Sequence, residues 1–430
     1  MKLESPKNKN YSAVVVELPN IRIACNGLDN LEAVSIFGYT VLVSKGSNGI
    51  GLFFPAETQL SDKFLYENNL YREDSRTGNL NKDKSSKGFF DKNGRVKAIK
   101  FKGNVSSGFF IGLDSLNWTG GNIDLLKVGD EFDFFNGNEI CRKYIIPTRI
   151  SDKRIVVDRG FKRADKKFMP EHIDTENFFR NAHKLNPNDE VIITQKLHGT
   201  SIRIANTMVN HKLSFIEKIA KLFGANIREY YYDYLYGSRK VIKDANNPNQ
   251  KHFYEEDIWT SEGKKLNGII PENYVIYGEL IGWTPEGKPI QKGYTYGIQQ
   301  NKCELFIYRI TIVNNKGLIT DLSWDQVKEF CVKNGLKYVP EIGKTILVNL
   351  TEDDFAYTKS LLDVRYFDEK LFKNCIWLGS GDVVDEGICI RKDGLIPTIF
   401  KAKSPKFLLH ETKLLDDNQE DLESSQNINE

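Results

Sequence analysis

The chain has 430 residues, more than one ordinary hydrophobic core holds, so two domains are expected at about 100 to 200 residues each. Its 60 basic residues nearly balance its 58 acidic residues, and the net charge is only +2. This balance excludes a globally basic protein, so nucleic acid would have to bind local basic surfaces. The 6 scattered cysteines contain no CxxC pair, which argues against a zinc site and a dense disulfide framework.

The ends and the hydropathy of the chain give an expectation about location. The first residues, Met-Lys-Leu-Glu-Ser-Pro, contain no apolar signal core. No stretch approaches the roughly 18 apolar residues of a membrane span. We therefore expect a cytoplasmic or otherwise intracellular monomer without a targeting signal or a membrane contact.

Residues 1–150 form the first predicted domain. Short apolar runs at 13–18, 39–43, 51–54 and 132–135, separated by Gly, Asn and Asp turns, predict strands and favour a small β-barrel. The segment 72–102 interrupts them with many lysines and arginines, among them Arg95 and Lys97 on an alternating, strand-like run. Most of these charges are expected on a solvated loop; the alternative is a flexible basic flap over nucleic acid.

The remaining chain divides into a connector, a second domain and a tail. Residues 151–185 predict a connector with a short helix from Asp174 or Thr175 to Lys184. Residues 186–412 alternate strands and helices, including an amphipathic helix over 324–334 that ends at Gly335. The basic and aromatic segment 207–235 predicts an inserted helical stretch, which either packs on the domain or binds nucleic acid. The tail, 413–430, is acidic and polar, and we expect it to be disordered.

Lys196 ends the apolar run that begins at Val191 and stands just before His198 and Gly199. A strand that ends in this way presents an amine, and the glycine lets the backbone approach a ligand closely. A lysine with a reference pKa of about 10.4 attacks phosphorus only if burial or neighbouring cations destabilise its ammonium. Lys401 and Lys403 are candidates for such cations, because their i, i+2 spacing places both on one face of a strand.

Two carboxylates and one aromatic ring complete the candidate chemistry. Glu279 lies inside an apolar strand, where an unpaired carboxylate costs several kcal/mol, so a hydroxyl, a cation or a metal-bound water is expected beside it. Glu386 opens the run 386–391 and is preceded by Asp382 and Asp385. Tyr308 lies in another apolar strand, and an aromatic ring at such a position is either part of the hydrophobic core or available to a ligand.

Together, the segments 191–203, 237–239, 277–280, 304–310, 386–391 and 401–403 resemble the ordered motifs of the covalent nucleotidyltransferases, which are DNA ligases, RNA ligases and mRNA capping enzymes. His198, where DNA ligases usually carry aspartate, resembles the RNA ligase branch. Residues 1–150 resemble, more loosely, the OB-like module that precedes the catalytic domain in one group of RNA ligases. The resemblance implies an α+β protein: an OB-like β-barrel, then an adenylyltransferase (ATP-grasp-like ligase) domain of antiparallel sheets and helices.

The implied activity is ATP-dependent joining of RNA ends that carry a 3'-hydroxyl and a 5'-phosphate. Lys196 would attack the α-phosphorus of ATP to form lysyl-AMP, AMP would pass to the RNA 5'-phosphate, and the 3'-hydroxyl would then displace AMP. The first domain lies outside the motif set, so we expect it to grip RNA and to take no part in the ATP pocket.

The resemblance also implies a role for each site residue. Lys401 and Lys403 would contact the α-phosphate, Glu279 the ribose, Tyr308 and Ile388 the two faces of adenine, and Glu386 a hydrated Mg2+, or alternatively Mn2+. Arg309 departs from the family pattern, in which an aspartate often follows the aromatic. The full implied nucleotide-binding set is Gln195, Lys196, Leu197, His198, Arg203, Arg239, Glu279, Tyr308, Glu386, Ile388, Lys401 and Lys403.

Three alternatives remain open. A DNA ligase would share the motifs. A capping guanylyltransferase would need a C-terminal OB domain, and the roughly 27 residues after Lys403 are too few for one. A catalytically inactive nucleic-acid-binding protein is disfavoured, because every charged motif position except that replaced by Arg309 is filled.

Overall fold

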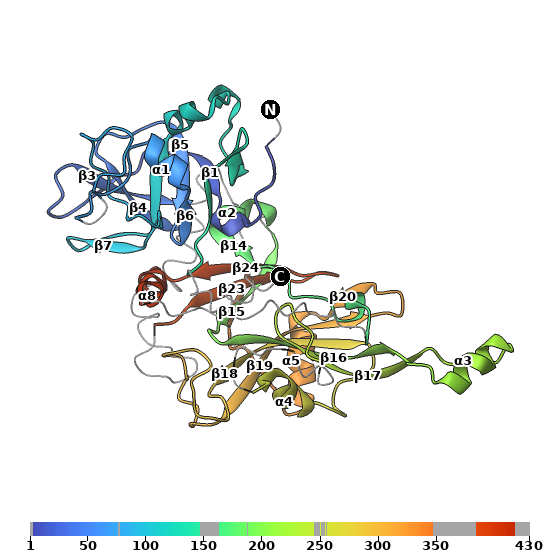
Figure 1. The fold of residues 1–430 in the computed structure, drawn as a ribbon. Coiled ribbons are helices and arrows are strands. Elements are labelled where there is room, and N and C mark those ends of the chain that lie inside the picture. The colour runs from blue at the N-terminus through green and yellow to red at the C-terminus, as the bar shows by residue number, and fades with distance from the viewer. Residues whose placement is uncertain are drawn as a thin grey trace.

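The computed structural model describes residues 3–75, 78–146, 163–186, 188–244, 250, 254, 256–346 and 384–417. It is a mixed α+β structure, as predicted. Figure 1 shows an N-terminal module above a five-stranded sheet, with a six-stranded sheet below that. No helix among the described residues is long and apolar enough to cross a membrane.

The N-terminal module is built around a sheet of order β10-β1-β5-β9, buried on both faces. Val14 and Val16 pack on one face against β3 and β4, while Ala13 and Val15 pack on the other. The elements are β1 (Ala13–Glu17), β2 (Ile23–Ala24), β3 (Leu31–Ile36), β4 (Tyr39–Ser44), β5 (Ile50–Pro55), β6 (Thr58–Leu60), α1 (Asp62–Glu67), β7 (Ile99–Phe101), β8 (Asn104–Ser106), β9 (Gly108–Gly112), β10 (Glu131–Phe132), β11 (Phe134–Phe135), β12 (Asn138–Glu139) and β13 (Cys141–Lys143).

The four predicted strands of this module are present, but a barrel is not found in its described part. The strands there form one four-stranded sheet, one three-stranded sheet and three two-stranded pairs. The alternating run 94–102 is a strand only over β7. The coarse prediction of a strand-rich first domain is therefore confirmed, whereas the OB-like barrel stays a prediction.

The five-stranded sheet has the order β14-β24-β23-β15-β22 and carries Lys196, Lys401 and Lys403. On β24, Phe400 and Ala402 are buried in the core beneath α2, and the alternating residues Lys401 and Lys403 lie on the other face, as predicted. The elements are β14 (Glu176–Asn177), α2 (Phe178–Asn181), β15 (Glu190–Lys196), β22 (Glu341–Ile346), β23 (Gly387–Lys392), β24 (Thr398–Lys403) and α8 (Pro405–Asp416).

The six-stranded sheet has the order β17-β16-β18-β19-β20, with β21 paired to β19. Helix α5 begins at the capping box of Ser323 and Gln326 and ends before Gly335, whose φ is 65°, as predicted. The elements are β16 (Thr200–Asn210), α3 (Phe215–Leu222), β17 (Tyr230–Gly237), α4 (Ile258–Lys264), β18 (Tyr274–Gly282), β19 (Cys303–Val313), β20 (Ile319–Asp321), α5 (Trp324–Lys333) and β21 (Lys337–Tyr338).

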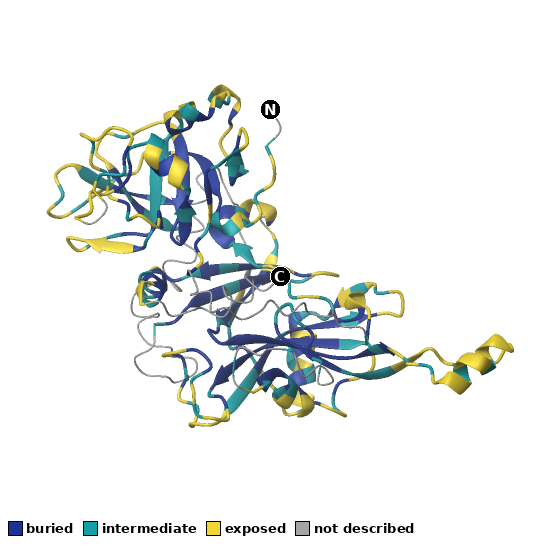
Figure 2. Ribbon diagram, viewed as in Figure 1, coloured by how far each residue is buried: buried dark blue, intermediate teal, exposed yellow. Residues whose placement is uncertain are grey.

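The segment 207–235 differs from the prediction of a helical insertion. It is mainly a β-hairpin arm, in which β16 and β17 pair from Arg203 with Gly237 to Asn210 with Tyr230, and only α3 at its tip is an α-helix. Tyrosines favour strands, and the run 230–236 is rich in them. The arm projects from the domain, and its tip is exposed (Figures 1 and 2).

Two boundaries also move. The predicted helix from Asp174 begins later, at Phe178, because Asn177 caps α2 with its side chain and residues 176–177 form β14. Helix α8 continues to Asp416, so the start of the predicted tail is ordered. Residues 151–162 of the predicted connector and 418–430 of the predicted tail lie outside the described residues.

Candidate active site

Lys196 ends a strand that is fixed on both sides. β15 pairs with β22 and β23, which places Lys196 opposite Gly387. Ile193 packs into the core beneath α2, and Ile192 packs into the core of the six-stranded sheet. The lysine side chain is 12% exposed, and its Nζ lies 2.9 Å from Oε1 of Glu386. The strand therefore holds one amine beside one carboxylate.

Glu386 is buried, and its carboxylate is charged. Burial works to raise its pKa, but Lys196, His198 and Lys403 outweigh burial and lower the pKa of Glu386 to about 2. Its Oε2 lies 3.4 Å from Nδ1 of His198. A permanently ionised carboxylate thus stands between the lysine and the histidine of the motif.

His198 is held in the core beside Glu386. The side-chain amide of Gln291 lies 2.8 Å from Nε2 of His198, which fits a ring that accepts there and carries its proton on Nδ1, toward Glu386. The rings of Tyr294 and Phe407 contact the imidazole edge to face. Its position suits a residue that orients Glu386.

Gly199 is required by the protein's own packing. A Cβ at this position would lie 2.2 Å from the carbonyl oxygen of Leu280 on β18. Its N–H donates to Oε1 of Glu279 at 3.1 Å. The close approach that we expected toward a ligand is therefore an approach between the turn and the neighbouring strand.

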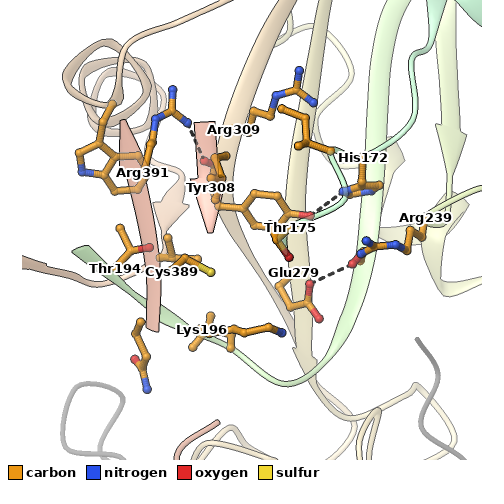
Figure 3. A pocket seen from close by; sticks show the side chains of 17 residues that line it. His172, Thr175, Thr194, Lys196, Arg239, Glu279, Tyr308, Arg309, Cys389 and Arg391 are labelled. Carbon is orange, nitrogen blue, oxygen red and sulfur yellow. Dashed lines mark hydrogen bonds between the residues drawn. The ribbon is translucent and has the colours of Figure 1, made fainter. Parts of the chain in front are cut away.

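A pocket of about 830 Å³, which includes space open to solvent, lies between the two sheets at Lys196 (Figure 3). Figure 3 shows Arg239 pointing toward Glu279 above Lys196. The predicted site residues that line it are Gln195, Lys196, Leu197, Arg239, Glu279 and Tyr308.

Tyr308 reaches the pocket through an irregularity in β19. The register between β18 and β19 shifts so that Tyr277 pairs with Arg309 and Gly278 pairs with Ile307, which makes Tyr308 the extra residue of a bulge. Its hydroxyl lies 2.6 Å from Nδ1 of His172. Phe306, in contrast, is buried in the core, so Tyr308 is the better candidate for a stacking ring.

Glu279 has the hydroxyl partner that its burial predicts. Ser201 Oγ donates to Glu279 Oε2 at 3.2 Å, and both residues line the pocket. Arg239 reaches the same pocket from the end of β17, and its Nη2 lies 2.8 Å from Oδ1 of Asp174. One acidic and one basic side chain therefore face the same part of the pocket.

The two lysines of β24 lie on the same strand face as Ile399, which lines the pocket, although neither lysine lines it. Lys403 Nζ donates to Oε1 of Glu411 at 2.6 Å. Burial acts to lower the pKa of Lys403, but Glu411, Tyr11 and Glu386 outweigh burial and raise this pKa well above its ordinary value. Lys403 is therefore a fixed positive charge.

Ile388 and Arg203 do not lie where their predicted roles need them. Strand β23 begins at Gly387, and alternation turns Ile388 into the core and Cys389 toward the pocket. Arg203 is buried and donates to the backbone oxygens of Ser238 and Met169, each at 2.9 Å. It joins backbone segments and does not line the pocket.

Sequence reasoning missed part of the pocket lining. Arg309 stands where the family often has an aspartate. It forms a buried ion pair with Asp321, and its guanidinium lies 4.5 Å from the ring centre of Tyr277. Alternation along β23 could have identified Cys389 and Arg391 as lining residues. The composition of the connector, in contrast, gave no signal that three of its residues line the pocket. The missed lining residues include His172, Ile173 and Thr175 of the connector, and Arg309, Cys389 and Arg391.

Known structures share this fold. The chain is similar to the RNA ligase of Naegleria gruberi in complex with PPi, at 16% identity and a TM-score of 0.57, over 94% of this chain and 99% of that chain. A mutant of that ligase without ligand matches at 15% identity and a TM-score of 0.58, over 95% of this chain and 100% of that chain. Another mutant, with ATP and Mn, matches at 16% identity and a TM-score of 0.54, over 94% and 99%.

A search of curated proteins found no match. The family model described as RNA ligase matches residues 189–403, which is half of the chain and contains the lysine strand, the pocket strands and the paired lysines. The chain therefore belongs to the RNA ligase family of the nucleotidyltransferase superfamily.

Proposed function

We propose that the protein is an ATP-dependent RNA ligase that joins 3'-hydroxyl and 5'-phosphate RNA ends through lysyl-AMP and RNA-adenylate. The observation that carries the proposal is the placement of Lys196, which lines the pocket with its amine beside the buried Glu386. Solved structures of the similar Naegleria gruberi ligase hold PPi and, in mutants, AMP and Mn or ATP and Mn, which supports ATP as the nucleotide.

In the first step, ATP would lie in the pocket with its base on Tyr308 and its ribose at Glu279. Lys196, an ammonium in its ion pair with Glu386, would first release a proton to solvent. The free amine would then attack the α-phosphorus, and the bond to the leaving pyrophosphate would break as the N–P bond forms. Lys401 and Lys403 would stabilise the charge that develops on the α-phosphate. The fixed charge of Lys403 supports this role.

A divalent metal fits the donor set around Lys196. No group of three His, Cys, Asp or Glu side chains that could hold a metal is found in the described part of the chain. Mg2+ and similar ions need only one or two carboxylates when they keep their waters, and the ionised Glu386 supplies one. When bound, the ion would neutralise charge on the phosphates. Glu386 would hold its waters beside the lysine.

In the later steps, AMP would pass from Lys196 to the RNA 5'-phosphate, and the 3'-hydroxyl would displace it. We propose that the N-terminal module, as an OB-like fold, contributes contacts to RNA phosphates. Some lysines of its basic segment, 72–102, are paired with carboxylates of the module and are therefore less available to RNA phosphates. Lys82 pairs with Glu67 at 2.8 Å, and Lys87 pairs with Glu73 at 3.0 Å. Exposed Lys92, Lys100 and Lys102 remain the better candidates for phosphate contacts.

The direct test is incubation of the protein with ATP or GTP labelled at the α-phosphate, followed by denaturing electrophoresis. A covalent adduct with ATP and a divalent metal, and sealing of nicked RNA in preference to nicked DNA, are the expected results. An adduct with GTP alone would favour a capping enzyme, sealing of DNA alone a DNA ligase, and the absence of any adduct an inactive binding protein.

Replacing Tyr308 with alanine should raise the KM for ATP in adduct formation by about 5- to 150-fold, because a base stacked on an aromatic ring gains about 1–3 kcal/mol. Tyr308→Phe keeps the ring and removes the hydroxyl that bonds to His172, so its KM should stay close to that of the wild type. The exposed Tyr66 offers a matched control, Tyr66→Ala. An unchanged KM in Tyr308→Ala would assign the ring to the core.

A further inference from the structure

Helix α8 links the active-site strand β24 to the N-terminal module. Lys403 ends β24, and Ser404 caps α8 by accepting the N–H of Phe407 at 3.0 Å and donating to the carbonyl oxygen of Asp385 at 2.9 Å. Further along the helix, Glu411 accepts the bond from Lys403 Nζ. Figure 1 shows α8 beside the ends of β23 and β24, on the side where the module lies. The carboxylate that orients Lys403 is therefore carried by this helix.

The residue that follows Glu411 is held by the module. Thr412 is 4% exposed, and its Oγ1 donates to Oε1 of Glu57 at 2.7 Å. Oγ1 of Thr412 also accepts a hydrogen bond from the N–H of Ala98 at 3.0 Å. Arg95 donates from Nη2 to the carbonyl oxygen of Thr412 at 3.1 Å. Both the side chain and the backbone of Thr412 are thus bonded to the module.

The partners of Thr412 are themselves fixed by a buried ion pair. Arg95 contacts Glu57 at 2.6 Å through Nε and at 2.9 Å through Nη2, and both side chains are buried. A buried polar cluster whose members satisfy one another is rigid, because moving one member leaves the others without partners. The cluster therefore anchors α8 in one position against the module.

Two outer contacts extend this anchor along the helix. Asp416 lies 2.9 Å from Nη1 of Arg95 and 3.0 Å from Nζ of Lys97. Earlier in the helix, Leu408 is buried against Ala56 and Ala98 of the module. The basic residues Arg95 and Lys97, which the sequence offered for RNA, are used here to hold α8.

We propose that the N-terminal module positions Lys403 for nucleotidyl transfer, acting through Thr412 and Glu411 on α8. The inference rests on the proposed function, in which Lys403 contacts the transferred phosphate. Thr412, Glu57 and Arg95 are then positioning residues that touch no substrate. A shift of α8 would move Lys403 away from the charge that develops in the transition state, and this lowers kcat more than it raises KM.

The first test is Thr412→Val in the full chain, which keeps the shape of the side chain and removes its hydroxyl. At saturating ATP, lysyl-AMP formation should slow at least about fivefold, since displacements of about 1 Å cost up to about 100-fold. The KM for ATP should change little. Thr412→Ser keeps the hydroxyl and should restore the rate, and Lys413→Ala, at an exposed position on the same helix, should match the wild type.

The second test asks whether Thr412 acts through Glu411. Glu411→Gln removes the charge that holds Lys403 and should itself slow lysyl-AMP formation. If the two residues act in series, the double variant Glu411→Gln with Thr412→Val should be no slower than Glu411→Gln alone. A wild-type kcat in Thr412→Val, or losses that multiply in the double variant, would overturn the inference.

Asp416→Asn covers the case in which Thr412→Val does not fold. The side chain of Asp416 is 43% exposed, so this change loosens the end of α8 without opening the buried cluster. A smaller loss of the same kcat at an unchanged melting temperature is expected, and an unchanged kcat would contradict the inference. A wild-type protein that forms no adduct with ATP or GTP would instead refute the proposed function.

Discussion

Replacing Lys196 with alanine should abolish formation of the AMP adduct while sealing of pre-adenylylated RNA continues. The amine is the proposed nucleophile of the first step, whereas the last step uses the RNA 3'-hydroxyl and needs no amine. The measurement pairs an adduct assay with α-labelled ATP and a sealing assay on RNA that already carries a 5'-AMP group. In this variant, the adduct assay should give no product, whereas the sealing assay should still give sealed RNA.

Lys184→Ala provides the matched control, because this lysine lies before the motif strand and pairs with Glu176 outside the pocket. It should behave as the wild type in both assays. An adduct that persists in Lys196→Ala, at any site, would remove Lys196 from its role as nucleophile. Loss of both activities together with a lowered melting temperature would show that the change had damaged the fold, and Lys196→Met would then replace it.

Local patterns predicted the strands of the candidate active site, because the relevant signals lie within a few residues. Alternation in β24 placed Lys401 and Lys403 on one face, and the apolar run of β15 placed Lys196 at its end. Ile388 was misplaced because its role came from the resemblance alone, whereas the alternation of β23 turns Ile388 into the core and its neighbour Cys389 toward the pocket. A shift of one residue turns each side chain of a strand to the other face.

Other features depended on contacts between residues far apart in the sequence. Arg95 reads as part of a basic segment, and its partners, Glu57 and Asp416, lie outside that segment. The bulge that turns Tyr308 into the pocket exists only in the pairing of β18 with β19. His172 of the connector lines the pocket because the fold brings it next to Tyr308, which lies more than 100 residues later in the chain. No local pattern contains this information.

Replacing Glu386 with alanine should slow lysyl-AMP formation at least about 100-fold, the scale of losing one preorganised charge contact. Glu386 is the buried carboxylate beside Lys196 and His198, and it is the candidate for holding the waters of the metal. Glu386→Gln keeps the shape and removes the charge, so a comparable loss would assign the effect to electrostatics. Lys401→Ala and Lys403→Ala should show losses of similar scale.

Lys392→Ala is the control for these lysine variants, because Lys392 lies in the neighbouring strand β23 and pairs with Asp189 at 2.7 Å, outside the pocket. Its adduct formation should match the wild type. The rates are best compared at saturating ATP and over a range of Mg2+ or Mn2+, since a weakened metal contact at Glu386 should respond to added metal and a lost phosphate contact at Lys401 or Lys403 should not. Normal adduct formation in the variants of Glu386, Lys401 and Lys403 would mean that these residues form a structural strand pair, and the candidate active site would have to be placed elsewhere.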